Sequence, residues 1–219
     1  MKSATNNKRS FLLLAAVLLV FNTLTFAQAT TAKDVFGNSE TPIVYLGIDF
    51  TKAKTIDEPT TEFDIRDKYY PGINDLIVNE AKKYDLKGAF HKAYMDHDLG
   101  PVMARNAKIN AQTIKSSNSA DFHKLQSSDI DALVKGFEFG DKKGAGLIFV
   151  AEAYSKSEKA IAIWVTLVDM GSRKVLMTER MQGKIGGFGL RNAEATGIKN
   201  IIEEIQKTKY QVWKTKYAN

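Results

Sequence analysis

Residues 144–184 read GAGLIFVAEAYSKSEKAIAIWVTLVDMGSRKVLMTERMQGK, and this stretch decides the fold that the sequence predicts. It holds three apolar runs of strand length, each rich in β-branched or aromatic residues. The runs are Leu147–Tyr154, Ala160–Met170 and Val175–Gln182. The linkers between them are too short for a parallel crossover, which needs about a dozen residues or more, so the stretch predicts an antiparallel three-strand meander.

The middle run has two apolar faces, which is typical of a strand covered on both sides. Along it, Ile161, Ile163, Val165 and Leu167 alternate with Ala162, Trp164, Thr166 and Val168. We therefore expect this strand near the centre of the sheet and Trp164 mostly buried.

The same periodicities predict further strands and helices on both sides of the meander. A buried strand is expected at Pro42–Phe50, followed by a helix with Ile73, Ile77 and Tyr84 on its apolar face. Next come a short strand within 102–109, a helix over 130–137, the meander, a helix over 190–205, and a tail at 210–213 that is either a last strand or a docking segment. This order predicts an α/β (α+β) fold, with a mixed sheet of about five strands and helices packed on it.

Residues 1–29 have the pattern of a signal peptide. Basic residues precede an apolar run from Phe11 to Phe26, and Ala27-Gln28-Ala29 fits the small-x-small cleavage pattern. The unbroken apolar part, Phe11–Phe21, has 11 residues, whereas a membrane-spanning helix needs about 20. We expect cleavage after Ala29 and export to the periplasm or cell envelope.

The remaining 190 residues, 30–219, are enough for one domain with a full-sized core. We expect a flexible lead at 30–41 and a single α/β domain at 42–219. Cleavage lowers the formal net charge from +6 to +3, a modest excess that ordinary surface charge explains better than an anionic partner. The chain has no cysteine, which excludes disulfides, a thiolate nucleophile and a lipid anchor at the cleavage site.

Three local sequences carry a family resemblance. They are PIVYLGIDF at 42–50, LIFVAEA at 147–153, and IWVTLVD at 163–169 followed by Gly171 and Lys174-Val175-Leu176. With the element order, they resemble the small envelope α/β domains related to the curli secretion protein CsgG, the penicillin-binding-protein activator LpoB and the amino-terminal domain of TolB. The resemblance implies an envelope scaffold or partner-binding domain without enzymatic activity, and it implies no particular site residues. This chain departs from that family in its lack of a lipobox cysteine and in its long connector at 51–66.

Two histidines suggest a metal site. His91 and His97 are six residues apart, and Asp96 and Asp98 flank the second. A zinc ion takes three or four converging nitrogen or oxygen ligands, but no HExxH or other helical ligand spacing is present. A polar loop is the better interpretation, and we assign no metal and no cofactor.

A glycine-rich turn is the second candidate. Lys184, Gly186, Gly187, Gly189 and Arg191 lie between a strand and a helix, where backbone amides and a helix N-terminus can hold an anion. Neither dinucleotide nor P-loop spacing is present, so the usual role of glycine in a turn is the main alternative. At least one glycine of 183–189 is expected at positive φ.

The sequence contains no GxSxG and no catalytic motif of another kind that stands out. We therefore predict an exported, non-enzymatic envelope domain that binds a protein partner or a cell-wall component, as a scaffold or in assembly, and that does not bind nucleic acid. The alternatives are a metal-assisted hydrolase that uses His91 and His97, or a binder of a small anionic ligand at the Gly183–Gly189 turn. The sequence does not set the partner or the oligomeric state.

Overall fold

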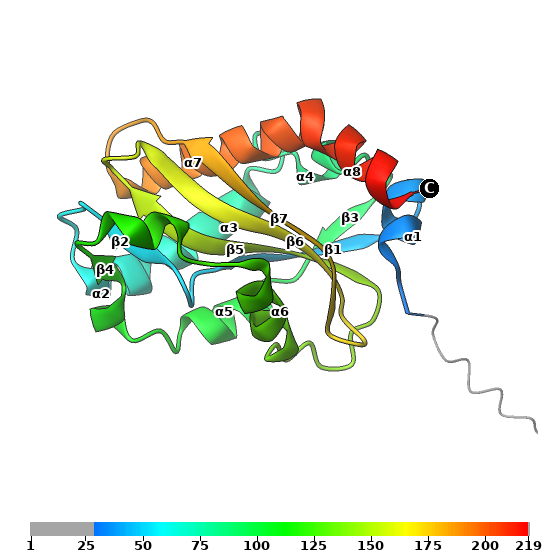
Figure 1. Ribbon diagram of the computed structural model, residues 1–219, viewed down its shortest axis with the longest axis horizontal. Coiled ribbons are helices and arrows are strands. Elements are labelled where there is room, and N and C mark those ends of the chain that lie inside the picture. The colour runs from blue at the N-terminus through cyan, green and yellow to red at the C-terminus, as the bar shows by residue number, and fades with distance from the viewer. Residues whose placement is uncertain (1–28, 219) are drawn as a thin grey trace, which may run out of the picture.

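The computed structural model describes residues 29–218, and in it helices cover both faces of one seven-stranded sheet (Figure 1). The strands are β1 (Ile43–Asp49), β2 (Lys54–Ile56), β3 (Met95–His97), β4 (Lys115–Ser116), β5 (Ala145–Ser155), β6 (Ala160–Asp169) and β7 (Lys174–Lys184). The α-helices are α1 (Ala32–Gly37), α2 (Glu62–Asp64), α3 (Tyr70–Asn79), α4 (Leu86–Ala89), α5 (Gly100–Asn106), α6 (Ser127–Lys135), α7 (Leu190–Glu204) and α8 (Tyr210–Tyr217). Short π-helical segments join α2 to α3 and α7 to α8, and the predicted signal peptide lies outside the described residues except for Ala29.

The sheet differs from the one that the sequence predicts. Five strands follow one another in the order β3-β1-β5-β2-β4, and all four pairings along this series are parallel. β6 pairs with β5, and β7 pairs with β6, both antiparallel. The prediction of about five strands organised by an antiparallel meander is therefore wrong, because the sheet has seven strands and five of them form a parallel series. It failed because β2, β3 and β4 have only two or three residues each, too few for a hydrophobic period to show.

The parallel strands converge on β5, whose 11 residues are all buried. β6 runs along one edge of β5 over its whole length, so β1 and β2 must share the other edge. There they pair with successive parts of β5, at 145–150 and 153–155. This arrangement places β3 beside β1 at one border of the sheet.

Helices cover the two faces unequally. The larger core lies on the side of α1, α3, α4, α7 and α8, where Leu147 and Phe149 of β5 point. The smaller core lies under α5 and α6 and takes Ile148 and Val150. In Figure 1, α7 and α8 lie above the sheet, and α5 and α6 lie below it.

Two asparagines complete the backbone hydrogen bonding of β1 where β3 no longer runs beside it. Asn74 of α3 accepts from the amide of Ile48 (2.7 Å) and donates to the Ile48 carbonyl (3.1 Å). Asn106 of α5 donates to the same carbonyl (2.9 Å) and accepts from the amide of Phe50 (2.8 Å). Both asparagine side chains are buried where water cannot reach, so they supply the hydrogen bonds that these backbone groups of β1 and Phe50 would otherwise lack.

Several local predictions need correction. The lead expected to be flexible contains α1, with Val35 and Phe36 buried. The strand expected within 102–109 is helix α5, and the tail is helix α8. Trp164 packs against the smaller core with its indole nitrogen buried, as expected, while the fully buried tryptophan is Trp213. Among residues 29–218, no helix is long and apolar enough to cross a membrane.

Candidate binding cavity at the edge of the sheet

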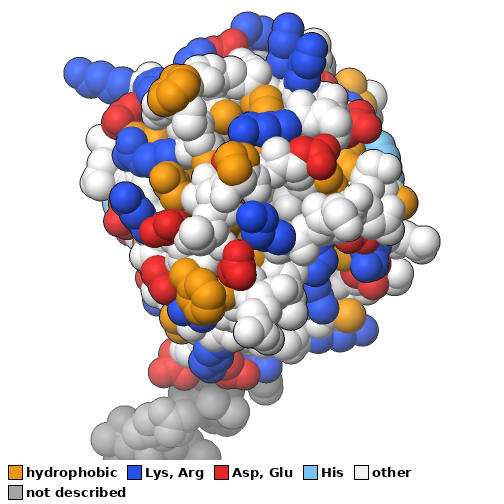
Figure 2. All heavy atoms as spheres, turned by 90° about the vertical axis from the view of Figure 1, so that its left-hand side faces the viewer, with side chains coloured by type: hydrophobic (Ala, Val, Ile, Leu, Met, Phe, Trp, Pro, Cys, Tyr) orange, Lys and Arg blue, Asp and Glu red, His pale blue; other side chains and the backbone are white. Residues whose placement is uncertain are grey.

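The glycine-rich turn is conformationally demanding, as predicted. Gly187 and Gly189 have φ of +89° and +80°. Between them Phe188 is 95% exposed. Lys184 and Arg191 are exposed, and the Arg191 side chain extends toward Gly72 of α3. Figure 2 shows this end of the molecule, where basic side chains are interspersed with acidic and apolar ones.

The two histidines have different surroundings. His91 has a φ of +49°, and its ring stacks on Tyr210 with the ring centroids 4.1 Å apart. His97 lies on β3, and its amide donates to the Asp96 carboxylate (2.7 Å). Within residues 29–218, no group of three or more His, Asp or Glu side chains is arranged to hold a metal ion.

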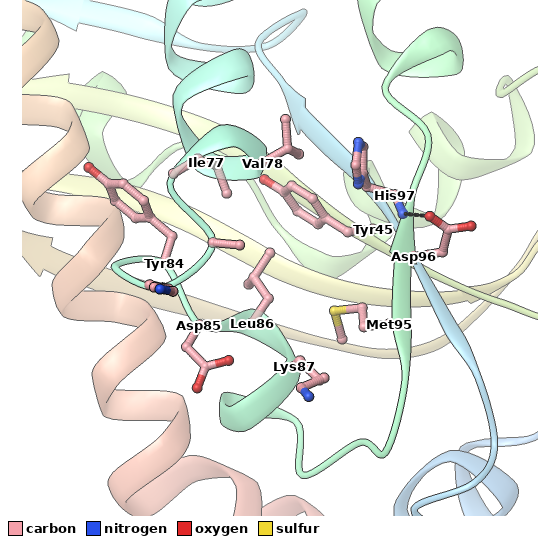
Figure 3. Close-up of a pocket in the computed structure, with 12 residues that line it drawn as sticks. Tyr45, Ile77, Val78, Tyr84, Asp85, Leu86, Lys87, Met95, Asp96 and His97 are labelled. Atoms are coloured by element: carbon pink, nitrogen blue, oxygen red, sulfur yellow. Dashed lines mark hydrogen bonds between the residues drawn. The ribbon is translucent and has the colours of Figure 1, made fainter.

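The structure instead shows an apolar cavity of about 480 Å³ next to β3. It is enclosed by α3, by the loop from α3 to α4, by α4, and by β1 and β3 (Figure 3). Its apolar wall consists of Ile77, Val78, Leu86 and Met95, together with the ring of Tyr45. This volume falls within the range of about 300–1,000 Å³ that is typical of ligand pockets.

Tyr45 and Tyr84 each bring a buried hydroxyl to the cavity, and that of Tyr45 lies beside β3. The side chain of Tyr45 is 1% exposed, and its hydroxyl has no hydrogen-bond partner within the described residues. The ring lies edge-on to Phe149, with the ring centroids 5.7 Å apart, and Figure 3 shows the hydroxyl turned toward Ile77 and Val78. Burial raises the pKa of Tyr45, so the hydroxyl stays protonated and able to donate.

The outer edge of β3 lies beside the cavity. The amide of Asp98 donates to the carbonyl of Tyr45 on β1 (2.9 Å). Because backbone groups in a strand alternate in direction, Asp96 also turns toward β1, while Met95 and His97 turn their backbone groups outward. The outward amide of His97 is satisfied by Asp96, the residue just before it.

Charged side chains of both signs surround the opening. Lys82, Asp85, Lys87 and Asp96 line it, and all four are exposed. Just after β3, Asp98 forms an ion pair with Lys142 (2.6 Å), which holds this border of the sheet to the loop before β5 and lowers the pKa of Asp98. The site is therefore apolar inside and of mixed charge at the rim.

Sequence analysis did not identify this cavity. It predicted Tyr45 as part of a buried strand and Ile77 as part of the apolar face of a helix. Nothing in the sequence indicated that Met95 lies on a strand, because the three residues of β3 are too few to show an alternating hydrophobic pattern. What brings these residues together is the parallel pairing of β1 with β3, which no local pattern encodes.

No protein-family model matches the chain, and no curated protein matches it. Among solved structures, it is similar to the crystal structure of lipoprotein GNA1162 from Neisseria meningitidis, at 14% sequence identity and a TM-score of 0.32. The match covers 77% of this chain and 98% of that chain. A TM-score this low carries no argument about function. The neighbour is described as a lipoprotein, whereas the present chain contains no cysteine.

Proposed function

We propose that this chain is an exported, non-enzymatic domain of the cell envelope that binds an extended segment of a partner protein at β3. One apolar side chain of that segment would fill the cavity beside the strand. The observation that carries the proposal is the buried, unpartnered hydroxyl of Tyr45 beside Ile77 and Val78; the other such hydroxyl of the lining, that of Tyr84, points away from it. A buried donor without a partner costs about 1–3 kcal/mol, so a bound segment that accepts from it recovers that cost.

A protein segment fits this place better than a free small molecule. Proteins commonly bind extended peptides by adding them to an exposed strand, so that backbone bonds supply affinity and a neighbouring pocket selects the side chain. Here β3 offers the outward amide and carbonyl of Met95 and the outward carbonyl of His97, and the cavity opens beside them. The mixed charges at the rim favour a segment with both acidic and basic flanking residues.

Selection from a random peptide library on immobilised 30–219 tests the proposal. Peptides of about ten residues with one large apolar side chain are expected, and calorimetry gives their affinities. Tyr45→Phe should weaken binding about 3- to 10-fold, the value of one hydrogen bond, while leaving the free protein at least as stable. Tyr70→Phe is the matched control, because the Tyr70 hydroxyl is also buried without a partner among residues 29–218 but Tyr70 does not line the cavity.

A second pair of variants tests the cavity itself. Ala81 is an exposed residue at the cavity mouth, and Ala132 is an exposed residue of α6 on the opposite face of the sheet. Ala81→Trp should block peptide binding, and Ala132→Trp should leave it unchanged. Peptides that bind both variants equally well would overturn the proposal. If the library yields no binding peptide, while apolar small molecules tested separately do bind, the cavity belongs to a different class of ligand.

A further inference from the structure

Asp169, at the end of β6, is a buried carboxylate with no charged side chain bound to it. It is 3% exposed. One oxygen, Oδ2, accepts from the amide (3.0 Å) and the hydroxyl (2.5 Å) of Ser172 in the following turn. The other, Oδ1, accepts from the backbone amide of Thr30 (3.3 Å). The ion pairs of the described residues do not include Asp169.

The position of Thr30 is fixed by the residues that follow it. Thr31 caps α1, with a reciprocal pair of bonds to Asp34. Phe36 of the same helix is buried and stacks on Tyr217 of α8, with the ring centroids 5.6 Å apart. Since α1 is locked onto the body of the protein, the Thr30 nitrogen stays beside Asp169 whether or not residues precede it.

We propose that cleavage after Ala29 makes the new α-ammonium group of Thr30 the counter-ion of Asp169, so that processing itself stabilises the fold. The inference depends on the predicted cleavage site and is independent of the binding cavity. In the cleavage, a signal peptidase adds water across the Ala29–Thr30 peptide bond. The carboxylate leaves on Ala29, and the amine stays on Thr30 and is protonated at neutral pH.

The surroundings have room for this change. A hollow of about 480 Å³ lies at this place, lined by Ala29, Thr30, Lys143, Gly144, Asp169, Gly171 and Ser172. The titratable side chains near the new amine and Asp169 include Lys143 in the hollow, Lys174 on β7, and Asp34, whose carboxylate accepts from the next amide, that of Thr31. A charge-assisted bond to a buried carboxylate is about twice as strong as the neutral amide bond that it replaces. An α-amino group ordinarily has a pKa of about 7.7–8.0, and the ion pair raises it.

Four proteins test the inference: residues 30–219 with a free Thr30 amine, residues 27–219 with the preceding three residues retained, and both with Asp169→Asn. At pH 6.5 the 30–219 form should melt roughly 2–4 °C above the 27–219 form, as expected for about 1 kcal/mol in a chain of this size. Asp169→Asn should remove that difference. A difference of the same size in the Asp169→Asn pair, or no difference in the wild-type pair, would overturn the inference.

The pKa of the terminal amine gives a second readout if Asp169→Asn does not fold. It is measured by NMR on 30–219 labelled with ¹⁵N-threonine. The expected value lies above the ordinary range of about 7.7–8.0, and the melting advantage should fade as the pH rises through it. An amine that titrates within the ordinary range would contradict the ion pair.

Discussion

At the scale of single residues, Glu194 is a carboxylic acid buried without an ion pair among the described residues. It lies on α7, is 2% exposed, and its Oε2 atom has no hydrogen-bond partner within residues 29–218. Burial, and secondly the negative charge of Glu58, raise the pKa of Glu194 to about 8 from an ordinary value of 4.5. Glu194 therefore enters the core as a neutral acid. Burial, and secondly the negative charge that Glu194 gains above its own pKa, raise the pKa of Tyr70.

The proton on Glu194 makes stability depend on pH. Between the unfolded pKa of 4.5 and the folded pKa of about 8, the native state keeps a proton that the unfolded state releases. The free energy of unfolding should therefore decrease as the pH rises through this window, by a few kcal/mol in total. Glu194→Gln carries no such proton, so its urea-unfolding free energy should be flatter from pH 5 to 9 and higher than wild type at pH 9. The same slope in both proteins would assign the pH dependence to other groups.

At the scale of elements, β7 and α7 are packed backbone to backbone. A Cβ atom added at Gly183 of β7 would lie 1.9 Å from the carbonyl oxygen of Gly197 on α7. One added at Gly197 would lie 2.4 Å from Ile161 of β6. Two glycines thus let the helix lie directly on the sheet, and any larger side chain must push it away.

Gly183→Ala should therefore lower the free energy of unfolding by about 1–3 kcal/mol or more, the usual cost of overpacking. Gly186→Ala is a matched control three residues away, where an added Cβ meets its nearest neighbour, Thr196, at 3.4 Å. That variant should change stability by less than about 1 kcal/mol, as at an ordinary turn position. Chemical denaturation measures both, and equal losses would show that the turn rather than the helix contact is sensitive.

The elements also show which sequence signals were informative. The 3.6-residue period predicted α6 and α7, because both are long enough to show an apolar face. Helix α5 was taken for a strand, although Pro101 in its first turn is a common helix-start signal. Helix α1 was taken for a flexible lead, although Thr31 and Asp34 have capping-box spacing. In both cases a residue at the helix start was more informative than the apolar pattern.

At the scale of the whole molecule, the central claim is that one border of the sheet is a binding surface. The sequence predicted a partner-binding domain without assigning residues to the partner, and its candidate residues at the Gly183–Gly189 turn belonged to the alternative of a small anionic ligand. Burial of Tyr45 could be predicted from the alternation in its strand. The missing partner of its hydroxyl could not, because the atoms around it come from α3 and β3, far away in the chain.

Hydrogen exchange of the β3 amides, measured by NMR with and without a saturating selected peptide, tests this claim most directly. If the peptide adds as a strand, the outward amide of Met95 gains a backbone partner, and its exchange should slow by at least about tenfold, as for about 1.4 kcal/mol of added protection. The control is the outer edge of β7, whose amides should exchange as before. Unchanged exchange at Met95 in the presence of saturating peptide, or slower exchange along β7 instead, would contradict the account.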